Sequence, residues 1–206
     1  MSITIVLVLI TCVISYLGFS NVEFFNKYKH QPYAEKHNNE WWRLLTSGFL
    51  HADWMHLLVN MFVFYQFGSI VENEFDYLFG TPMSKIYFTA IYLTTIVMSS
   101  LPSYYKHQND GYYSAIGASG GTSGIVFIYI LFYPWNLLYF YGIIPIPGIV
   151  GGIAYLIYSS WASRHSNDNI GHDAHFYGAI FGVLLTILIK PMIFQQFIQE
   201  LMSFNF

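Results

Sequence analysis

Three short polar clusters stand at the ends of apolar runs, and they contain the residue types needed for nucleophilic catalysis. The first cluster holds His51, His56 and Asn60, the second holds Ser119 between glycines, and the third holds His175. A serine hydroxyl becomes a strong nucleophile when a neighbouring base removes its proton, and histidine is the commonest such base. A serine and a histidine could together form an activated nucleophile, so Ser119 and His175 are candidates for that chemistry.

The composition places these clusters in a membrane protein. Only 9% of the 206 residues are charged and 55% are apolar, whereas a soluble domain carries about 25% charged residues. Such a chain cannot cover a water-facing surface, which excludes a soluble enzyme and a disordered protein. A net charge of −3 with eight cationic residues excludes a basic surface for nucleic acid. The single cysteine, Cys12, excludes an intrachain disulfide framework and a Cys-rich zinc site.

Apolar runs separated by polar loops predict an all-α, polytopic membrane protein with six transmembrane helices in one domain over residues 1–206. About 20 mostly apolar residues cross the hydrocarbon as a helix, and the period-2 alternation of a barrel is absent. We expect the long loop over 20–46 to lie partly at the membrane interface and the tail over 192–206 to lie flat on it. The six expected spans cover residues 1–19, 55–71, 86–101, 117–132, 143–161 and 174–189.

Each polar cluster stands at the N-terminal end of an even-numbered span. Even-numbered spans all run in the same direction, so the three clusters must lie in the same leaflet whichever way the protein is inserted. Helix N-termini also present free N–H groups and a positive dipole end, which favour a developing negative charge. His56 and Asn60 are four residues apart and share a helix face, whereas His51 falls on another face and is expected to hold the loop entry.

Glycine pairs four residues apart accompany both Ser119 and His175. Such pairs let the backbones of two membrane helices approach closely. We therefore expect the fourth and sixth spans to pack together and to bring Ser119 within hydrogen-bond reach of His175. The glycines expected at this contact are Gly117, Gly120, Gly124, Gly178 and Gly182.

Other interpretations of the same polar residues remain open. A serine in a membrane helix often bonds a carbonyl one turn back, and Asn60 alone could join helices. A proton-coupled transporter would use similar buried groups, but no inverted repeat is visible. A metal site is a further alternative, although its residues form no recognisable ligand set and no metal or cofactor is expected. That set would comprise His51, His56, His172, Asp173 and His175.

The chain resembles the rhomboid intramembrane serine proteases at four ordered motifs. Trp42-Arg43 is similar to that family's Trp-Arg signature, and the spacing of His51, His56 and Asn60 fits its second-span pattern. Gly117-Ala118-Ser119-Gly120 fits its G-x-S-G motif, and the run from Ala174 to Gly182 fits its A-H-x-x-G-x-x-x-G motif. A second copy of G-x-S-G contains Ser123, but the position of Ser119 at the start of the span favours Ser119.

The resemblance implies an intramembrane serine endopeptidase that cuts in or near the transmembrane helices of single-span substrate proteins. It implies a Ser119–His175 dyad, an acyl-enzyme, an oxyanion hole with His56 and Asn60, and activity as a monomer in the lipid bilayer without nucleic acid. A non-catalytic rhomboid-like protein that binds membrane helices is the alternative.

Two indications of orientation disagree. The resemblance implies a cell-membrane protein with cytoplasmic termini and a site that opens outward. The excess of positive residues would instead place the first, third and fifth loops in the cytoplasm. These loops hold Lys27, Lys29, Lys36, Arg43, Lys106 and Arg164, against Lys85 and Lys190 on the opposite side.

Overall fold

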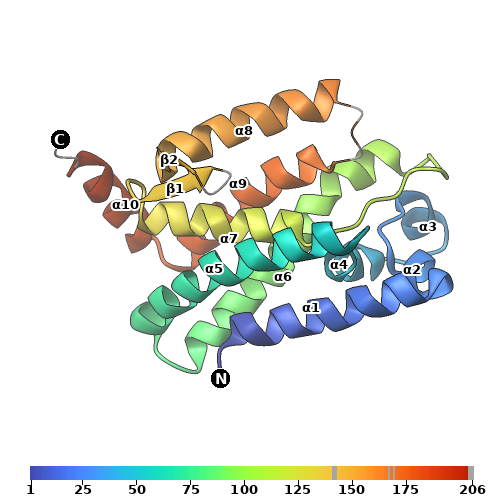
Figure 1. The fold of residues 1–206 in the computed structure, drawn as a ribbon, viewed down its shortest axis with the longest axis horizontal. Coiled ribbons are helices and arrows are strands. Elements are labelled where there is room, and N and C mark those ends of the chain that lie inside the picture. The colour runs from blue at the N-terminus through green and yellow to red at the C-terminus, as the bar shows by residue number, and fades with distance from the viewer. Residues whose placement is uncertain (141–142, 167, 169, 204–206) are drawn as a thin grey trace.

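The computed structural model describes residues 1–140, 143–166, 168 and 170–203, and it is mostly helical. Its helices lie roughly along one long axis, with a small hairpin beside them (Figure 1). The elements in chain order are α1 (Ile3–Ser20), α2 (Val22–Tyr28), α3 (Pro32–His37), α4 (Arg43–Thr46), the 3-10 helix η1 (Ser47–Phe49), α5 (Trp54–Phe79), α6 (Met83–His107), α7 (Ser119–Phe132), β1 (Leu137–Phe140), β2 (Ile144–Pro147), α8 (Gly148–His165), α9 (His172–Ile189) and α10 (Met192–Met202).

Four helices of the described chain, α1, α5, α6 and α9, are long and apolar enough to cross a membrane. Helix α7 is apolar but has only 14 residues, and at 1.5 Å per residue it is shorter than the hydrocarbon thickness. Helix α8 has 18 residues and carries polar side chains such as Ser159, Ser160 and Arg164. The expected all-α, polytopic architecture therefore holds in its long apolar helices, while α7 and α8 fall outside the length and composition of a full span.

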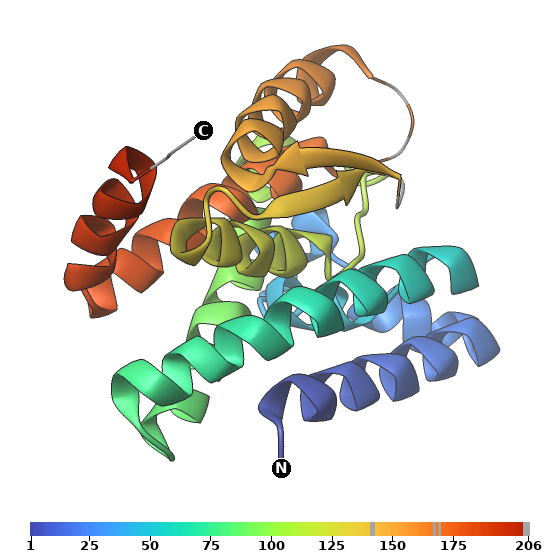
Figure 2. The ribbon, with the colours of Figure 1, turned by 60° about the vertical axis from the view of Figure 1, so that its left-hand side comes forward.

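The short apolar helix α7 lies at the centre of the helix bundle. It contacts α5, α6, α8, α9 and α10, and Figure 2 shows α1 and α5 side by side on one flank with α8 and the hairpin on the other. Ten residues of α7, including Ile125, Ile128 and Tyr129, are buried. A helix enclosed by protein on all sides does not need to match the bilayer thickness, which explains how so short a segment occupies the core.

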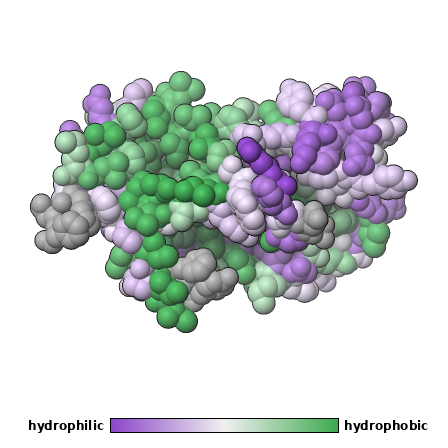
Figure 3. Space-filling view, turned by 90° about the horizontal axis from the view of Figure 1, so that it is seen from above, coloured by the Kyte–Doolittle hydropathy of each residue, from purple (hydrophilic) through white to green (hydrophobic). Residues whose placement is uncertain are grey.

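Apolar and polar residues are separated along the long axis of the surface. In Figure 3 the hydrophobic residues cover one part of the face and the hydrophilic residues gather at one end. Large apolar side chains such as Leu58, Phe62 and Leu184 are more than half exposed. Exposed apolar surface on this scale is expected of a protein whose surroundings are lipid tails.

The loop between α1 and α5 folds into short helices that are tied together by Arg43. Its Nε donates to Glu40 Oε2 at 2.5 Å, and its Nη1 donates to the carbonyl oxygens of Asn26 and Lys29 at 2.7 and 3.0 Å. The Arg43 side chain is buried, and these partners satisfy the charge that burial would otherwise penalise. Arg43 therefore joins α2 to α4. The folded loop between α1 and α5, residues 21–53, is called the platform below.

Several expected boundaries are wrong, and the third span, expected over 86–101, extends as α6 from Met83 to His107. The helix predicted over 143–161 begins only at Gly148, because residues 144–147 form β2, which pairs antiparallel with β1. Pro145 and Pro147 explain the difference, since proline lacks the N–H that a helix interior requires. The second expected span, 55–71, continues as α5 to Phe79. The tail forms α10 as far as Met202, and its residues 204–206 lie outside the described residues.

Candidate functional site

The segment before α7 is fixed by the platform formed between α1 and α5. His30 and Ala115 form a two-way backbone bridge with N···O distances of 3.0 Å, and the Gly117 N–H donates to the Ser47 carbonyl at 3.0 Å. Gly117 has a φ of +122°, a backbone conformation that side-chain-bearing residues rarely adopt. This geometry turns the chain sharply, so that α7 begins at Ser119.

The start of α7 packs against α9 with almost no space between the two backbones. A Cβ added to Gly178 would lie 2.7 Å from the carbonyl carbon of Gly120, and one added to Gly182 would lie 2.6 Å from the Cα of Gly124. The glycine spacing predicts a close contact between these two helices, and Gly120 and Gly124 of α7 meet Gly178 and Gly182 of α9 there. Gly117 makes a different contact, with the His56 ring.

The turn that carries Ser119 lies level with the turn that carries His175. A Cβ added to Gly120 would lie 3.3 Å from the carbonyl oxygen of Ala174, the residue before His175. The hydrogen bonds among the described residues do not include one between the Ser119 hydroxyl and the His175 ring. Catalytic hydrogen bonds are often long in unliganded enzymes and tighten with substrate.

His56 approaches Ser119 from α5. A Cβ added to Gly117 would lie 3.1 Å from His56 Nε2 and 3.7 Å from Ser119 Oγ, so both side chains reach the same side of Gly117. The Ala52 N–H donates to His56 Nδ1 at 3.5 Å. With Nδ1 accepting, the neutral ring carries its proton on Nε2, and a donor therefore faces the space beside Ser119.

The remaining predicted residues take different positions around this space. Asn60 is buried, and one of its amide hydrogens is used in a 3.0 Å bond to the His56 carbonyl. His51 is fully buried behind His56, and its ring stands edge-to-face to that of His56 with centroids 4.8 Å apart. Trp42 is half-exposed on the platform. The structure therefore brings His56 and Ser119 to the same side of Gly117, with Asn60 bonded to the His56 carbonyl one turn along α5.

His51 donates a hydrogen bond that links the loop entry to α1. The Ser15 hydroxyl donates to the Phe49 carbonyl at 2.8 Å, so its oxygen accepts from His51 Nδ1 at 2.9 Å. Burial, assisted by the neighbouring His56 and opposed by Asp53, lowers the pKa of His51 to about 3. The ordinary histidine value is about 6.5, so the folded protein disfavours protonation of this ring.

The low pKa of His51 predicts that acid destabilises the fold. Between pH 6.5 and pH 3 the unfolded His51 binds a proton that the folded one does not, so the free energy of unfolding falls as the pH falls. Between pH 6.5 and pH 5 we expect the free energy of unfolding of the unsubstituted protein to fall by about 2 kcal/mol more than that of His51→Gln. Thermal unfolding in detergent at both pH values measures it, and equal losses in the two proteins would refute it.

One residue beside His175, Tyr155, was not predicted from the sequence. The Tyr155 ring of α8 stacks on the His175 ring, with centroids 6.1 Å apart and an interplanar angle of 24°. The Tyr155 hydroxyl shares a 2.8 Å hydrogen bond with Ser123 on α7. The second G-x-S-G copy drew attention to Ser123, but the pairing of these residues depends on tertiary packing that the local sequence does not reveal.

His172 forms a separate pair at the entrance of α9. Its Nε2 lies 3.1 Å from Asp168 Oδ2, and its ring stands edge-to-face to His175 at 6.0 Å. The bond from His172 is the main cause that lowers the pKa of Asp168 to about 2. Among the described residues, no group of three or more His, Cys, Asp or Glu side chains is placed to hold a metal ion.

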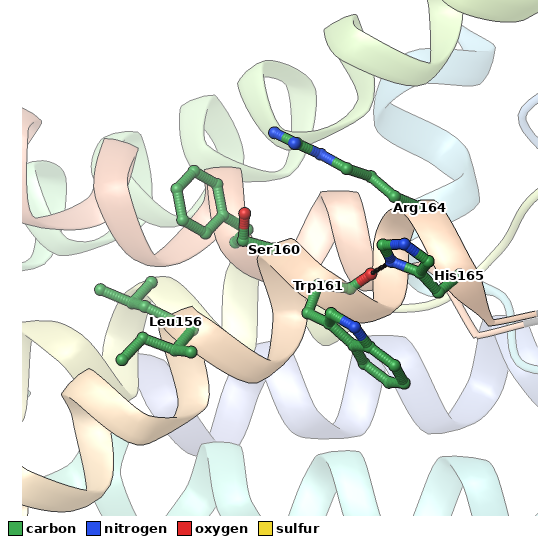
Figure 4. Close-up of a pocket in the computed structure, with 7 residues that line it drawn as sticks. Leu156, Ser160, Trp161, Arg164 and His165 are labelled. Carbon is green, nitrogen blue, oxygen red and sulfur yellow. Dashed lines mark hydrogen bonds between the residues drawn. The ribbon is translucent and has the colours of Figure 1, made fainter.

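A hollow of about 410 Å³ is lined by residues of α8 and by Phe176 of α9. Figure 4 shows Trp161, Arg164 and His165 along this helix, with the His165 ring bonded to the Trp161 carbonyl at 2.9 Å. This hollow contains none of the predicted catalytic side chains. Its lining residues are Leu156, Ile157, Ser160, Trp161, Arg164, His165 and Phe176.

Residues 38–192 match the family model described as "Rhomboid domain". "Putative rhomboid protease YdcA" from Bacillus subtilis (strain 168) is 28% identical over 153 residues, which cover 73% of this chain and 68% of that protein. "Rhomboid-like protein 11, chloroplastic" from Arabidopsis thaliana is 30% identical over 162 residues, covering 73% and 53%. "RHOMBOID-like protein 12, mitochondrial" from the same plant is 27% identical over 143 residues, covering 66% and 43%. The matched parts span about half the length of these plant proteins.

Proposed function

Because this chain belongs to the rhomboid family of polytopic membrane proteins, we propose that it is an intramembrane serine endopeptidase. In this proposal Ser119 is the nucleophile, His175 is the general base, and the substrate is the transmembrane segment of another protein. The observation that carries the proposal is the close backbone contact of α7 with α9, which sets the Ser119 turn level with the His175 turn.

The proposed reaction proceeds through an acyl-enzyme. Ser119 Oγ attacks the carbonyl carbon of the scissile peptide bond while His175 takes the hydroxyl proton. The carbon–nitrogen bond then breaks, and His175 returns the proton to the leaving amine. Water attacks the resulting ester with the same histidine as base, which releases the acid product and restores the Ser119 hydroxyl. No metal or cofactor takes part in this scheme.

The oxyanion formed in each step needs donors aimed at it, and three kinds support the proposal. His56 presents its Nε2 proton beside Ser119, and the Asn60 amide retains a second hydrogen beyond the one bonded to the His56 carbonyl. The first N–H groups of α7, beginning at Ser119, lack acceptors within the helix. The positive end of the helix dipole adds to their effect.

Loss of the Asn60 donor should slow turnover while leaving the protein folded. We expect Asn60→Ala to lower kcat about 10²–10³-fold, the usual effect of removing one oxyanion donor. KM should change little, because the interaction strengthens only as negative charge develops. Steady-state cleavage of a single-span substrate in liposomes measures both constants. A kcat within twofold of the unsubstituted protein would remove Asn60 from the proposed oxyanion hole.

The membrane position of the site follows from the same proposal. We infer six spans, with α7 and α8 as the fourth and fifth, and a site that opens toward the side on which the loop platform lies. Both termini then lie on the opposite, cytoplasmic side of the cell membrane, and Figure 1 supports this by placing the N-terminus and α10 away from α2 and α3. Substrates would enter from the lipid bilayer, and one copy would suffice for activity.

Reconstitution tests the proposed activity against its non-catalytic alternative. The purified full chain is mixed in liposomes with a model single-span protein, and the products are separated and their masses determined. Cleavage inside or beside the transmembrane segment is expected. Stable association of the intact substrate without any cleavage would overturn the proposed activity and favour a protein that only binds membrane helices.

A further inference from the structure

The His175 ring lacks a hydrogen-bonding partner that would fix its orientation in the part of the chain that the structure describes. The hydrogen bonds given for His175 involve its backbone N–H, which donates to the Gly171 carbonyl at 3.0 Å, and none involves a ring nitrogen. A histidine that serves as a base works best when a third group orients it. In this protein that orientation must come from packing.

Tyr155 supplies the contact on the face of the ring. The two rings are nearly parallel, at 24° with centroids 6.1 Å apart, while His172 touches the same ring edge-on at 86°. A face contact and an edge contact together restrict rotation about the terminal side-chain bond of His175, which is otherwise soft. Aromatic contacts of this kind are offset-stacked and favourable.

The Tyr155 ring is itself held from the nucleophile helix. Its hydroxyl shares a 2.8 Å hydrogen bond with Ser123, which lies one turn after Ser119 on α7. The Phe127 ring, one further turn along α7, contacts Tyr155 with centroids 5.9 Å apart. Helix α8 packs on both α7 and α9, so Tyr155 is in direct contact with the helix of the base and with the helix of the nucleophile.

We propose that Tyr155 is a positioning residue that sets the angle of the His175 ring relative to Ser119, with Ser123 fixing Tyr155. This inference rests on the proposed peptidase function and adds a part to it. It also gives α8 a part in aligning the base. Any displacement of α8 from α7 separates Tyr155 from Ser123 and removes the face contact from His175, so alignment of the base depends on where α8 lies.

The test measures ring position and turnover separately. The ring carbon–proton resonances of His175, assigned with His175→Gln in protein labelled at histidine, report the ring current of Tyr155 without requiring activity. Tyr155→Leu should shift these resonances and lower kcat roughly 10- to 100-fold with KM unchanged, as expected of a misplaced reacting group. Tyr155→Phe keeps the ring and should cost only about fivefold in kcat, the effect of one lost hydrogen bond.

The hydrogen bond and the control are tested in the same series. Ser123→Ala should match Tyr155→Phe, and the double variant should be no slower than either single one, because all three remove the same bond. Tyr158→Leu is the matched control, since its exposed ring lies on the same helix and touches His172 but not His175. It should leave kcat and the His175 resonances unchanged.

The outcomes distinguish the positioning role of Tyr155 from the proposed peptidase function. Unmoved His175 resonances or an unchanged kcat in Tyr155→Leu would overturn the positioning role, as would an equal loss in Tyr158→Leu. If the unsubstituted protein cleaves nothing while Tyr155→Leu alone shifts the His175 resonances, the proposed peptidase function fails but the face contact is upheld.

Discussion

Replacing Ser119 by alanine should abolish substrate cleavage, with kcat reduced by at least about 10⁴-fold. The substitution removes only the oxygen that forms the acyl-enzyme. His175→Ala should produce a loss of similar size, because the residues of such a unit act together and their effects are not additive. Cleavage of a single-span substrate in liposomes, followed over a time long enough to detect slow residual turnover, measures both effects.

The neighbouring serine provides the control for this substitution. Ser123 lies one turn after Ser119 on α7 and is also part of a G-x-S-G sequence, but its hydroxyl is bonded to Tyr155. Ser123→Ala should retain cleavage within about tenfold, whereas Ser119→Ala should show none. If the two variants exchanged these results, Ser123 would be the nucleophile and the proposed site would be displaced by one helical turn.

A methyl group at Gly178 should disrupt the packing on which the whole site depends. A Cβ there would meet the carbonyl oxygen of Gly120 far inside contact distance and would lie 2.7 Å from its carbonyl carbon. Both are backbone atoms, which cannot rotate away as a side chain could. We expect Gly178→Ala to lower the free energy of unfolding by about 3 kcal/mol, at the upper end of overpacking effects, and to lower kcat about 10²-fold in the protein that remains folded.

Gly151 on α8 is the matched control for this steric argument. A Cβ at that position would lie 3.6 Å from the Ile146 side chain, an ordinary contact. Gly151→Ala should therefore leave the protein as stable or slightly more stable, because alanine favours a helix by about 1 kcal/mol over glycine. Unfolding in a denaturing detergent gradient compares the two. A Gly178→Ala protein as stable as Gly151→Ala would show that α7 and α9 are not in backbone contact.

The long helices were predictable because their signal lies in the local sequence. Continuous apolar runs predict α1, α5, α6 and α9, and their lengths are set by the thickness of the bilayer. The same signal fails over residues 144–147, which fall in the expected fifth span but form strand β2. There Pro145 and Pro147 remove the N–H groups that a helix needs, and an apolar run without a clear period does not distinguish the two structures.

The sequence proposes the residue types of the candidate site but little of what surrounds them. The polar clusters and the glycine spacing single out Ser119 and His175, because a polar group in an apolar span is costly and therefore conspicuous. Tyr155 could not be found in this way, since it is one of 18 tyrosines and its contacts with His175 and Ser123 exist only after α8 has packed. Arg43 was noticed, but two of its three acceptors are backbone carbonyl groups, which the sequence does not distinguish.

The pairing of Ser119 with His175 is tested most directly by covalent labelling with a fluorophosphonate probe. The probe reacts only with an activated serine, and mass spectrometry of the digested protein identifies the labelled residue. We expect a single adduct on Ser119, formed at a rate that falls by at least about 10³-fold in His175→Ala. An adduct on another serine, or labelling of Ser119 at an undiminished rate without His175, would contradict the proposed dyad.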